Sequence, residues 1–450
     1  MGRSKPIRRK PGWAAIFVLV VLSASLVLIV GKPNYPELGS ASRAALRQRA
    51  GQPQLVRAEP LPAVEGLQEG MECAWMPASA PSTLLGAFQQ PGGPVTAAPA
   101  SVPIDRAPIR AIRDTYPTYS AVAVDLNSNE VYLQDENLFG YKVFDRLANT
   151  PPGAEFSEPK RIVGGINTKL EFNCALYVDP TSGDVYSVAN DTMDTLVVFP
   201  REAQGNVAPM RELHTPHGTY GIAVDEAAQE MFLTVQHING VVVYPKTAAG
   251  EDEPIRRLAG DRTALEDPHG IAVDPKNGWM FVSNHGSVKN TRPPRVGRFE
   301  PPSITVYPLR ASGDTPPIRI IEGPRTQLNW PAHLFVDPEH GELYVANDVG
   351  DSVLVFRITD SGDVAPSRVI RGPKAGLKNP TGLFVDLAND ELWVSSMGNH
   401  SARVFMRTAD GDVAPMRIIR SAPAGKIALA IGNPGATAYD SRRDEILVPN

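Results

Sequence analysis

The 450-residue chain has none of the short motifs that mark common catalytic sites. It lacks the Gly-x-Ser-x-Gly turn of serine hydrolases and the His-Glu-x-x-His motif of zinc proteases. It also lacks a phosphate-binding loop, because the pair Gly164-Gly165 is a turn that follows a predicted strand. A catalytic or binding site therefore has to be assembled from residues that lie far apart in the sequence.

Cysteine is also scarce, and basic residues are fewer than acidic ones. The two cysteines, Cys73 and Cys174, leave one disulfide and two free thiols as open alternatives. The net charge is −5, and the first twelve residues hold five basic residues and no acid, so the remainder carries about −10. Because nucleic-acid binding needs a basic face that neutralises phosphates, we expect no nucleic-acid partner.

A helical periodicity is absent after residue 100, and a repeated hairpin pattern takes its place. An Asp that ends an apolar run is followed seven residues later by a large apolar residue in a second run. This pair occurs seven times, at Asp125/Tyr132, Asp179/Tyr186, Asp225/Phe232, Asp274/Phe281, Asp337/Tyr344, Asp386/Trp393 and Asp440/Leu447. The interval is constant, whereas successive Asp residues lie 46 to 63 positions apart. A constant core with variable connections is typical of a repeat array whose insertions lie in loops.

Each of the first six units continues with two further strand-like runs. The third run is β-branched and aromatic, as in Val241-Val-Val-Tyr244, and the fourth opens with Pro-x-Arg, as in Pro254-Ile-Arg256. Gly, Asn, Asp and Pro separate the runs, which is the composition of turns. Four short strands in each period of about 40 to 50 residues predict the blade of a β-propeller.

The ends of the chain predict how the ring closes. The seventh hairpin stops at Asn450, while a seventh Pro-x-Arg precedes the first hairpin at Pro108-Ile-Arg110. We therefore predict an all-β, seven-bladed β-propeller over residues 94–450 that is closed by both termini. The repeated Asp and Arg are predicted to cap turns and to pair with carboxylates or carbonyls, because groups present in every blade favour a structural role.

The N-terminus predicts attachment to a membrane. Residues 1–12 are basic, and residues 13–31 form an uncharged apolar run that is long enough to cross a bilayer as one transmembrane helix. The basic residues hold the N-terminus in the cytoplasm, so we expect a single-pass signal anchor with the propeller outside, in the periplasm or at the cell surface. A cleaved signal peptide is the alternative. Residues 32–93 predict a Pro- and Ala-rich linker.

Parts of the repeat resemble a known family. Gly270-Ile-Ala-Val-Asp274 with Gly278-Trp-Met-Phe-Val-Ser-Asn284 is similar to an NHL repeat. Glu342-Leu-Tyr-Val-Ala-Asn347 is similar to the related YVTN-type propeller repeat. The resemblance covers roughly residues 107–450 and implies a β-propeller. These families include protein-binding and RNA-binding modules, sensor ectodomains, lactonases and a zinc-dependent amidating lyase, so the resemblance implies a fold rather than one activity.

Histidines offer the best candidates for a site, because they do not repeat from unit to unit. In a propeller, the loops before the first strand and after the second strand share one face, which we call the top face. Seven of the eight histidines belong to it, mostly in the third and fourth units. The candidate ligand-binding residues at this face are His217, Tyr220, His237, His269, Asn284, His285, His333, Asn347 and Asp348.

Three functions fit this pattern. We expect a ligand- or protein-binding module that holds a protein or a small polar ligand at its top face. The first alternative is a metal-dependent lyase or lactonase-type hydrolase that holds zinc or calcium at the channel mouth. The candidate metal ligands are His217, His269, His285 and His333. Strand alternation weakens this alternative, because His269 and His333 stand at positions of opposite parity relative to their Asp residues. The second alternative is a structural component of the cell envelope or surface layer.

Overall fold

The computed structural model describes residues 114–190, 192–288, 298–429, 438–440, 442 and 445–447. In these residues, six four-stranded antiparallel sheets each arise from one continuous unit, and we number them as blades 1 to 6. Blades 1 and 2 consist of β1 (Tyr119–Asp125), β2 (Glu130–Asp135), β3 (Gly140–Asp145) and β4 (Arg161–Gly164), then β5 (Asn173–Val178), β6 (Val185–Ala189), β7 (Thr195–Phe199) and β8 (Arg211–His214). Blades 3 and 4 consist of β9 (Thr219–Asp225), β10 (Glu230–Val235), β11 (Gly240–Pro245) and β12 (Arg256–Ala259), then β13 (Pro268–Asp274), β14 (Trp279–Asn284), β17 (Ser303–Pro308) and β18 (Arg319–Glu322). Blades 5 and 6 consist of β19 (Pro331–Asp337), β20 (Glu342–Asn347), β21 (Ser352–Arg357) and β22 (Arg368–Ile370), then β23 (Pro380–Asp386), β24 (Glu391–Ser396), β25 (Ser401–Met406) and β26 (Arg417–Arg420).

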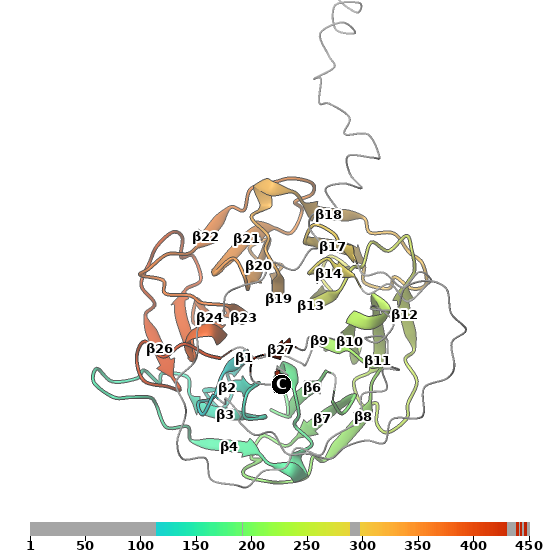
Figure 1. The fold of residues 1–450 in the computed structure, drawn as a ribbon. Coiled ribbons are helices and arrows are strands. Elements are labelled where there is room, and N and C mark those ends of the chain that lie inside the picture. Colours follow the sequence, from blue (N-terminus) through green and yellow to red (C-terminus); the bar gives the residue numbers. More distant parts are fainter. Residues whose placement is uncertain are drawn as a thin grey trace, which may run out of the picture. The chain divides into compact units, whose positions relative to one another are not determined.

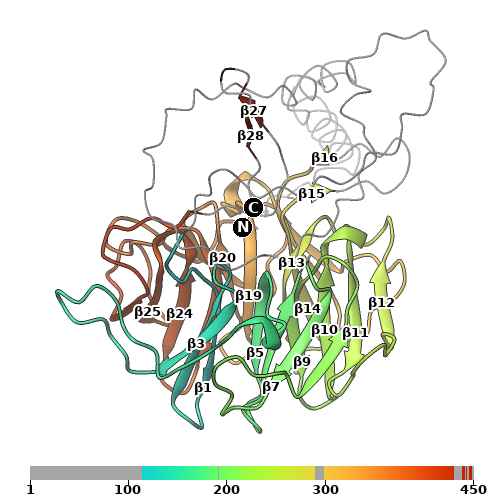
Figure 2. The same ribbon diagram turned by 60° about the horizontal axis from the view of Figure 1, so that its bottom comes forward.

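The blades stand around a common axis, as expected for a β-propeller. The first strands, such as β9, β13 and β19, lie innermost, and the fourth strands, such as β8, β12 and β18, lie at the periphery (Figure 1). Figure 2 shows the same sheets from the side, with their strands running along the axis. Neighbouring sheets pack face to face, so that Phe281 and Ile304 of blade 4 share a buried cluster with Leu343 and Val345 of blade 5. Because both faces of each sheet are covered, its central strands are apolar at almost every position.

The predicted number of blades is wrong, because the ring holds six blades rather than seven. The seventh hairpin, β27 (Ala438–Asp440) and β28 (Glu445–Leu447), forms a two-stranded sheet of its own. Its predicted partner strand at Pro108-Ile-Arg110 lies outside the described residues. The physical reason is that blades 6 and 1 pack directly against each other, which leaves no space for another sheet between them.

Blade 1 and blade 6 close the ring through the same kinds of contact that join the other blades. Tyr119 of β1 and Trp393 of β24 belong to one buried cluster. At the opposite end of the sheets, Arg146 Nη1 lies 2.8 Å from Glu391 Oε2. At the periphery, the Thr150 backbone N–H donates to the Ile418 carbonyl at 2.7 Å. A complete interface of this kind stabilises the closed ring and removes its open edges.

The structural role predicted for the repeated Asp and Arg is confirmed. The Asp125 carboxylate accepts a hydrogen bond from the Asn127 backbone N–H at 2.9 Å, which caps the turn between the first two strands. Arg256 pairs with Glu230 of its own blade at 2.6 Å. Other members of the Arg series lie over the aromatic ring of the second strand, and the Arg417 guanidinium lies 5.5 Å from the Trp393 ring centre.

A buried polar clasp fastens the start of the ring to its end. The segment that precedes β1 places the Asp114 carboxylate 2.9 Å from Nε2 of His400, a fully buried residue that follows the short helix η5 (Met397–Asn399). His400 Nδ1 lies 2.7 Å from the Pro117 carbonyl. The Leu429 backbone N–H donates to Asp114 at 3.0 Å. The two ends of the described ring are therefore joined side by side.

The predicted membrane segment is not part of the described structure. Residues 1–12, 13–31 and 32–93 all lie outside the described residues. Among the residues that the structure does describe, no helix combines the length and the apolar character needed to cross a membrane.

The clasp predicts a large loss of stability in the variant His400→Ala. Removing the imidazole leaves the buried Asp114 carboxylate with backbone N–H donors alone, so the free energy of unfolding should fall by about 3 kcal/mol. His340→Ala is the matched control, because His340 pairs with Asp337 while being itself almost half exposed, and it should cost less than about 1 kcal/mol. Chemical denaturation of the two variants measures both changes, and equal losses would contradict the role of the clasp.

Candidate functional site

The top face is the end of the ring at which the first strands begin and the second strands end. In blade 4, Pro268 at the start of β13 pairs with Asn284 at the end of β14. In blade 5, Pro331 at the start of β19 pairs with Asn347 at the end of β20. This register confirms the expected arrangement of loops, because residues before the first strand and after the second lie at one end of each sheet.

Three predicted residues meet at the centre of the top face. The Tyr220 ring centre lies 4.3 Å from that of His269 and 5.7 Å from that of His333. These residues belong to β9, β13 and β19, which are the first strands of three successive blades. The side chains therefore converge although their strands belong to different sheets.

Irregular strand pairing explains why the parity argument fails for these residues. The pairing of β13 with β14 skips from Pro268 to Ile271, and that of β19 with β20 skips from Pro331 to Leu334. His269 and His333 lie inside these two interruptions. A β-bulge breaks the alternation of side chains and re-aims them, so residues of opposite parity can face one centre.

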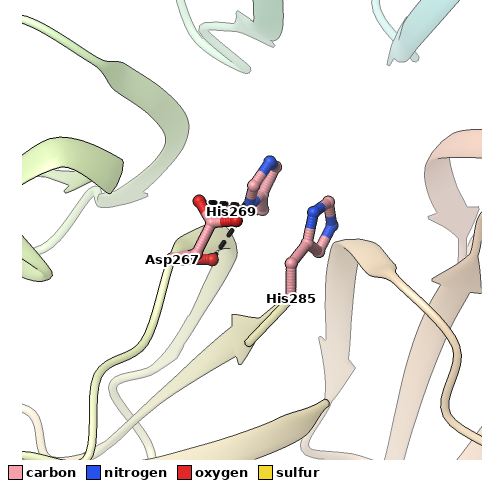
Figure 3. A group of neighbouring side chains, drawn as sticks. All are labelled: Asp267, His269 and His285. Atoms are coloured by element: carbon pink, nitrogen blue, oxygen red, sulfur yellow. Dashed lines mark hydrogen bonds and ion pairs between the residues drawn. The ribbon is translucent and has the colours of Figure 1, made fainter. Parts of the chain in front are cut away.

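A fourth residue, His285, completes a stack of rings. The ring centres of His269 and His285 lie 3.3 Å apart with an interplanar angle of 17°, and Figure 3 shows the two rings side by side with Asp267 next to them. On its other side, His285 stacks on Trp330 at 5.0 Å. Both histidines are 7% exposed. Sequence analysis did not select Asp267 or Trp330, because each occurs singly in a loop without a repeated pattern.

Backbone carbonyl groups orient all three histidines in the same way. His269 Nδ1 lies 2.9 Å from the Asp267 carbonyl, and His333 Nδ1 contacts the Thr381 carbonyl. His285 makes a backbone hydrogen bond with Pro331, which has only a carbonyl to offer. Each ring therefore donates one N–H to the backbone and leaves Nε2 as an acceptor.

The remaining ring nitrogens differ in what they contact. His269 Nε2 lies 2.6 Å from the side-chain amide nitrogen of Gln236. The Nε2 atoms of His285 and His333 are buried and have no hydrogen-bond partner among the described residues. Both nitrogens are acceptors that do not repeat from blade to blade, and both belong to one group of neighbouring rings, so they point to a ligand.

Burial keeps the three rings neutral. It lowers the pKa of His269 to about 3, with His333 adding a smaller effect of the same sign. Burial also lowers the pKa of His333, and it lowers that of His285 well below the ordinary value, with His269 contributing. At neutral pH each ring therefore offers a lone pair rather than a positive charge.

Three carboxyl groups with raised pKa values are associated with these rings. Burial raises the pKa of Asp267 to about 7 and that of Glu136, the residue after β2, also to about 7, with Asp348 contributing to the latter. Burial raises the pKa of Asp348 to about 6. The pKa of the Tyr220 hydroxyl is raised well above its usual value. The largest cause is burial, and smaller contributions come from Cys174, Glu136, Asp348 and Asp267. We call Tyr220, His269, His285 and His333 with these three acids the central cluster.

The other predicted residues lie elsewhere or serve the fold. His217 pairs with Asp194 at 2.9 Å and lies next to His237, with ring centres 4.5 Å apart and the ring planes tilted by 59°. Asn284 and Asn347 are buried and accept hydrogen bonds from the loops before their own first strands, at 3.0 and 2.6 Å. Their amides therefore hold loops in place.

Among the residues that the structure describes, one group of side chains has donors close enough to share a metal ion. A ring nitrogen of His269, one of His285 and a carboxylate oxygen of Asp267 all lie within 4.8 Å of one another. Two of the four predicted metal ligands belong to this group, His217 and His333 do not, and Asp267 is added. Neutral imidazoles and a carboxylate are the donors that zinc prefers.

Comparisons with known proteins show only distant similarity. No family model and no curated protein sequence matches the chain. A protein of unknown function from Desulfotomaculum acetoxidans is 13% identical, with a TM-score of 0.45 over 70% of this chain and 88% of that one. Kuenenia stuttgartiensis hydrazine synthase is 11% identical, with a TM-score of 0.45 over 76% and 98%. A structure of a Nidogen/Laminin complex is 14% identical, with a TM-score of 0.42 over 68% and 95%. The propeller assignment itself rests on the order of the strands.

The raised pKa of Glu136 predicts a pH-dependent gain in the variant Glu136→Gln. The folded protein holds this proton up to about pH 7, whereas the unfolded chain releases it near pH 4.5, so wild-type stability falls as the pH rises between these values. The variant does not lose stability in this way. Its free energy of unfolding should exceed that of the wild type by on the order of 1 kcal/mol at pH 8 but not at pH 4. Urea denaturation at both pH values tests this, and a gain that is equal at both would contradict it.

Proposed function

We propose that the protein is a binding module that holds a small polar ligand in the central cluster of its top face. The observation that carries this proposal is the pair of buried Nε2 atoms on His285 and His333 that lack a hydrogen-bond partner among the described residues. A buried acceptor without a donor costs about 1 to 3 kcal/mol, and a ligand that donates to it recovers this energy.

The contrast with the rest of the ring supports a functional role for the cluster. The carboxylates that repeat from blade to blade have partners, as in Asp125 with the Asn127 backbone and Glu230 with Arg256. The central cluster does not repeat, and its acids keep raised pKa values because burial outweighs their favourable contacts. Groups that destabilise the fold and converge at one place are typical of ligand sites. The NHL-like and YVTN-like segments are compatible with a binding module of this kind.

A metal-dependent lyase or lactonase-type hydrolase is the second candidate. It is favoured by the donors of Asp267, His269 and His285, which lie within 4.8 Å of one another. Such a metal would polarise a substrate oxygen or activate a bound water, and these three residues would hold it. Ring geometry argues against this candidate, because the two stacked imidazoles differ in plane by only 17°.

Ligand screening with a matched pair of variants tests the binding function. A panel of small polar compounds should contain members that raise the melting temperature of the wild type but not that of His285→Phe, in which a ring of similar size still stacks on Trp330. His340→Phe, on the opposite face, should respond like the wild type. Elemental analysis of the same preparation distinguishes the binding module from the metal-dependent enzyme. Stoichiometric zinc in the wild type that is lost in His269→Ala would favour the enzyme.

We also propose that residues 13–31 anchor the protein in a membrane with the propeller outside the cytoplasm. The basic residues 1–12 and the uncharged apolar run after them support this proposal. N-terminal sequencing of the membrane fraction should recover the chain with residues 13–31 retained. A mature chain that begins after residue 31 would instead favour a cleaved signal peptide.

A further inference from the structure

We propose that the ligand of the central cluster is an organic ammonium ion that carries N–H donors, held by Asp267 and by the Nε2 atoms of His285 and His333. This inference rests on the proposed binding function and adds the chemical class of the ligand. Three independent features of the cluster lead to it: its acceptors, its charge and its aromatic walls.

The cluster offers acceptors that require donors from the ligand. His285 is 7% exposed, its Nδ1–H is directed to the Pro331 carbonyl, and its Nε2 has no partner among the described residues. His333 repeats this arrangement with the Thr381 carbonyl. A ring nitrogen of His285 and a carboxylate oxygen of Asp267 lie within 4.8 Å of each other. Since all these atoms accept hydrogen bonds, the ligand must supply several donors.

The acids of the cluster favour a cation. In the described part of the chain, the only basic side chain that acts on Asp267, Glu136 or Asp348 is Lys378, which acts on Asp348. Lys378 is itself paired with Asp351 at 3.0 Å. Burial without a neutralising cation disfavours the charged form of a carboxylate, and a positively charged ligand restores that form.

The walls of the cluster suit an organic cation. Trp330 stacks on His285 and is 43% exposed, and Tyr220 faces both His269 and His333. Aromatic faces attract ammonium groups and also bury the carbon atoms that such groups carry. The cluster thus combines acceptors for N–H groups with apolar surfaces for the carbon part of the ligand.

The arrangement of the rings favours an ammonium group over a metal ion. The lone pair of an imidazole lies in the plane of its ring, and the planes of His269 and His285 run nearly parallel with ring centres 3.3 Å apart. Their lone pairs therefore lie side by side instead of converging on one ion at about 2.0 to 2.1 Å. An ammonium group carries up to three donors that diverge, so separate acceptors can each receive one.

Four probes that share a benzyl group test this inference by ligand-observed NMR titration. Benzylammonium should bind at least 10-fold more tightly than benzyl alcohol and benzoate, because only the cation complements the acids. It should also bind more tightly than benzyltrimethylammonium, which has charge but no N–H donor. Asp267→Asn should weaken benzylammonium binding about 10-fold, whereas Glu339→Gln, which removes an exposed acid from the opposite face, should leave it unchanged.

Each remaining outcome overturns the inference in a distinct way. Benzyl alcohol or benzoate could bind as tightly as benzylammonium and lose this binding in His285→Phe. That result would support the binding site but contradict its preference for a cation. Equal binding of benzyltrimethylammonium would reject the N–H donors. Stoichiometric zinc that prevents benzylammonium from binding would show that the ligand of the cluster is a metal ion. Benzylammonium binding that survives in Asp267→Asn and in His285→Phe would place the cation away from the central cluster.

Discussion

Close approach of neighbouring first strands is the constraint on which both the ring and the central cluster depend. A Cβ atom at Gly270 would lie 2.1 Å from the Ala332 carbonyl oxygen of the next blade, and one at Gly221 would lie 2.3 Å from the His269 carbonyl oxygen. Only glycine fits these positions without a shift of the backbone. The Ser283 hydroxyl binds both the Gly270 N–H and the Ala332 carbonyl, at 2.8 and 2.7 Å, and so ties two blades together. The bulges that re-aim His269 and His333 lie at the same level of the strands.

The two faces of the ring use charge in different ways. At the face opposite the central cluster, a basic residue after the third strand reaches the preceding blade, as Lys246 does to Asp179 at 2.6 Å and Arg201 to Asp125 at 2.8 Å. These pairs compensate their buried carboxylates. At the top face, Glu136 and Asp267 have no such cation among the described residues, and their pKa values rise to about 7. This repeated compensation of carboxylates therefore belongs to one face, and the acids of the central cluster that suit a ligand lie at the other.

Sequence patterns predicted the strands well, because a strand depends on local alternation and on turn residues. They failed on the number of blades, because a hairpin such as β27–β28 carries the same local pattern whether or not four strands complete its sheet. They placed Tyr220, His269, His285 and His333 on one face, since the order of strands determines which loops share an end. They missed Asp267, Glu136 and Trp330, because a single residue in a loop leaves no periodic signal. Sequence analysis also missed the basic residues that follow the third strand. They do not occur in every blade, because blade 5 has Ile358 at that position.

The corrected number of blades also explains why the central cluster can form. In a ring of strands, each added blade moves the first strands away from the axis, so that side chains of non-adjacent blades separate. With six blades, Tyr220 of blade 3 still lies 5.7 Å from His333 of blade 5, two blades away. Glu136 of blade 1 and Asp348 of blade 5 raise the pKa of the same Tyr220 hydroxyl. A seventh blade would widen the ring, weaken these cross-axis interactions and reduce the desolvation that keeps the three imidazoles neutral. The same packing of blade 6 on blade 1 that excludes the seventh hairpin therefore also brings the acceptors close enough to share one ligand.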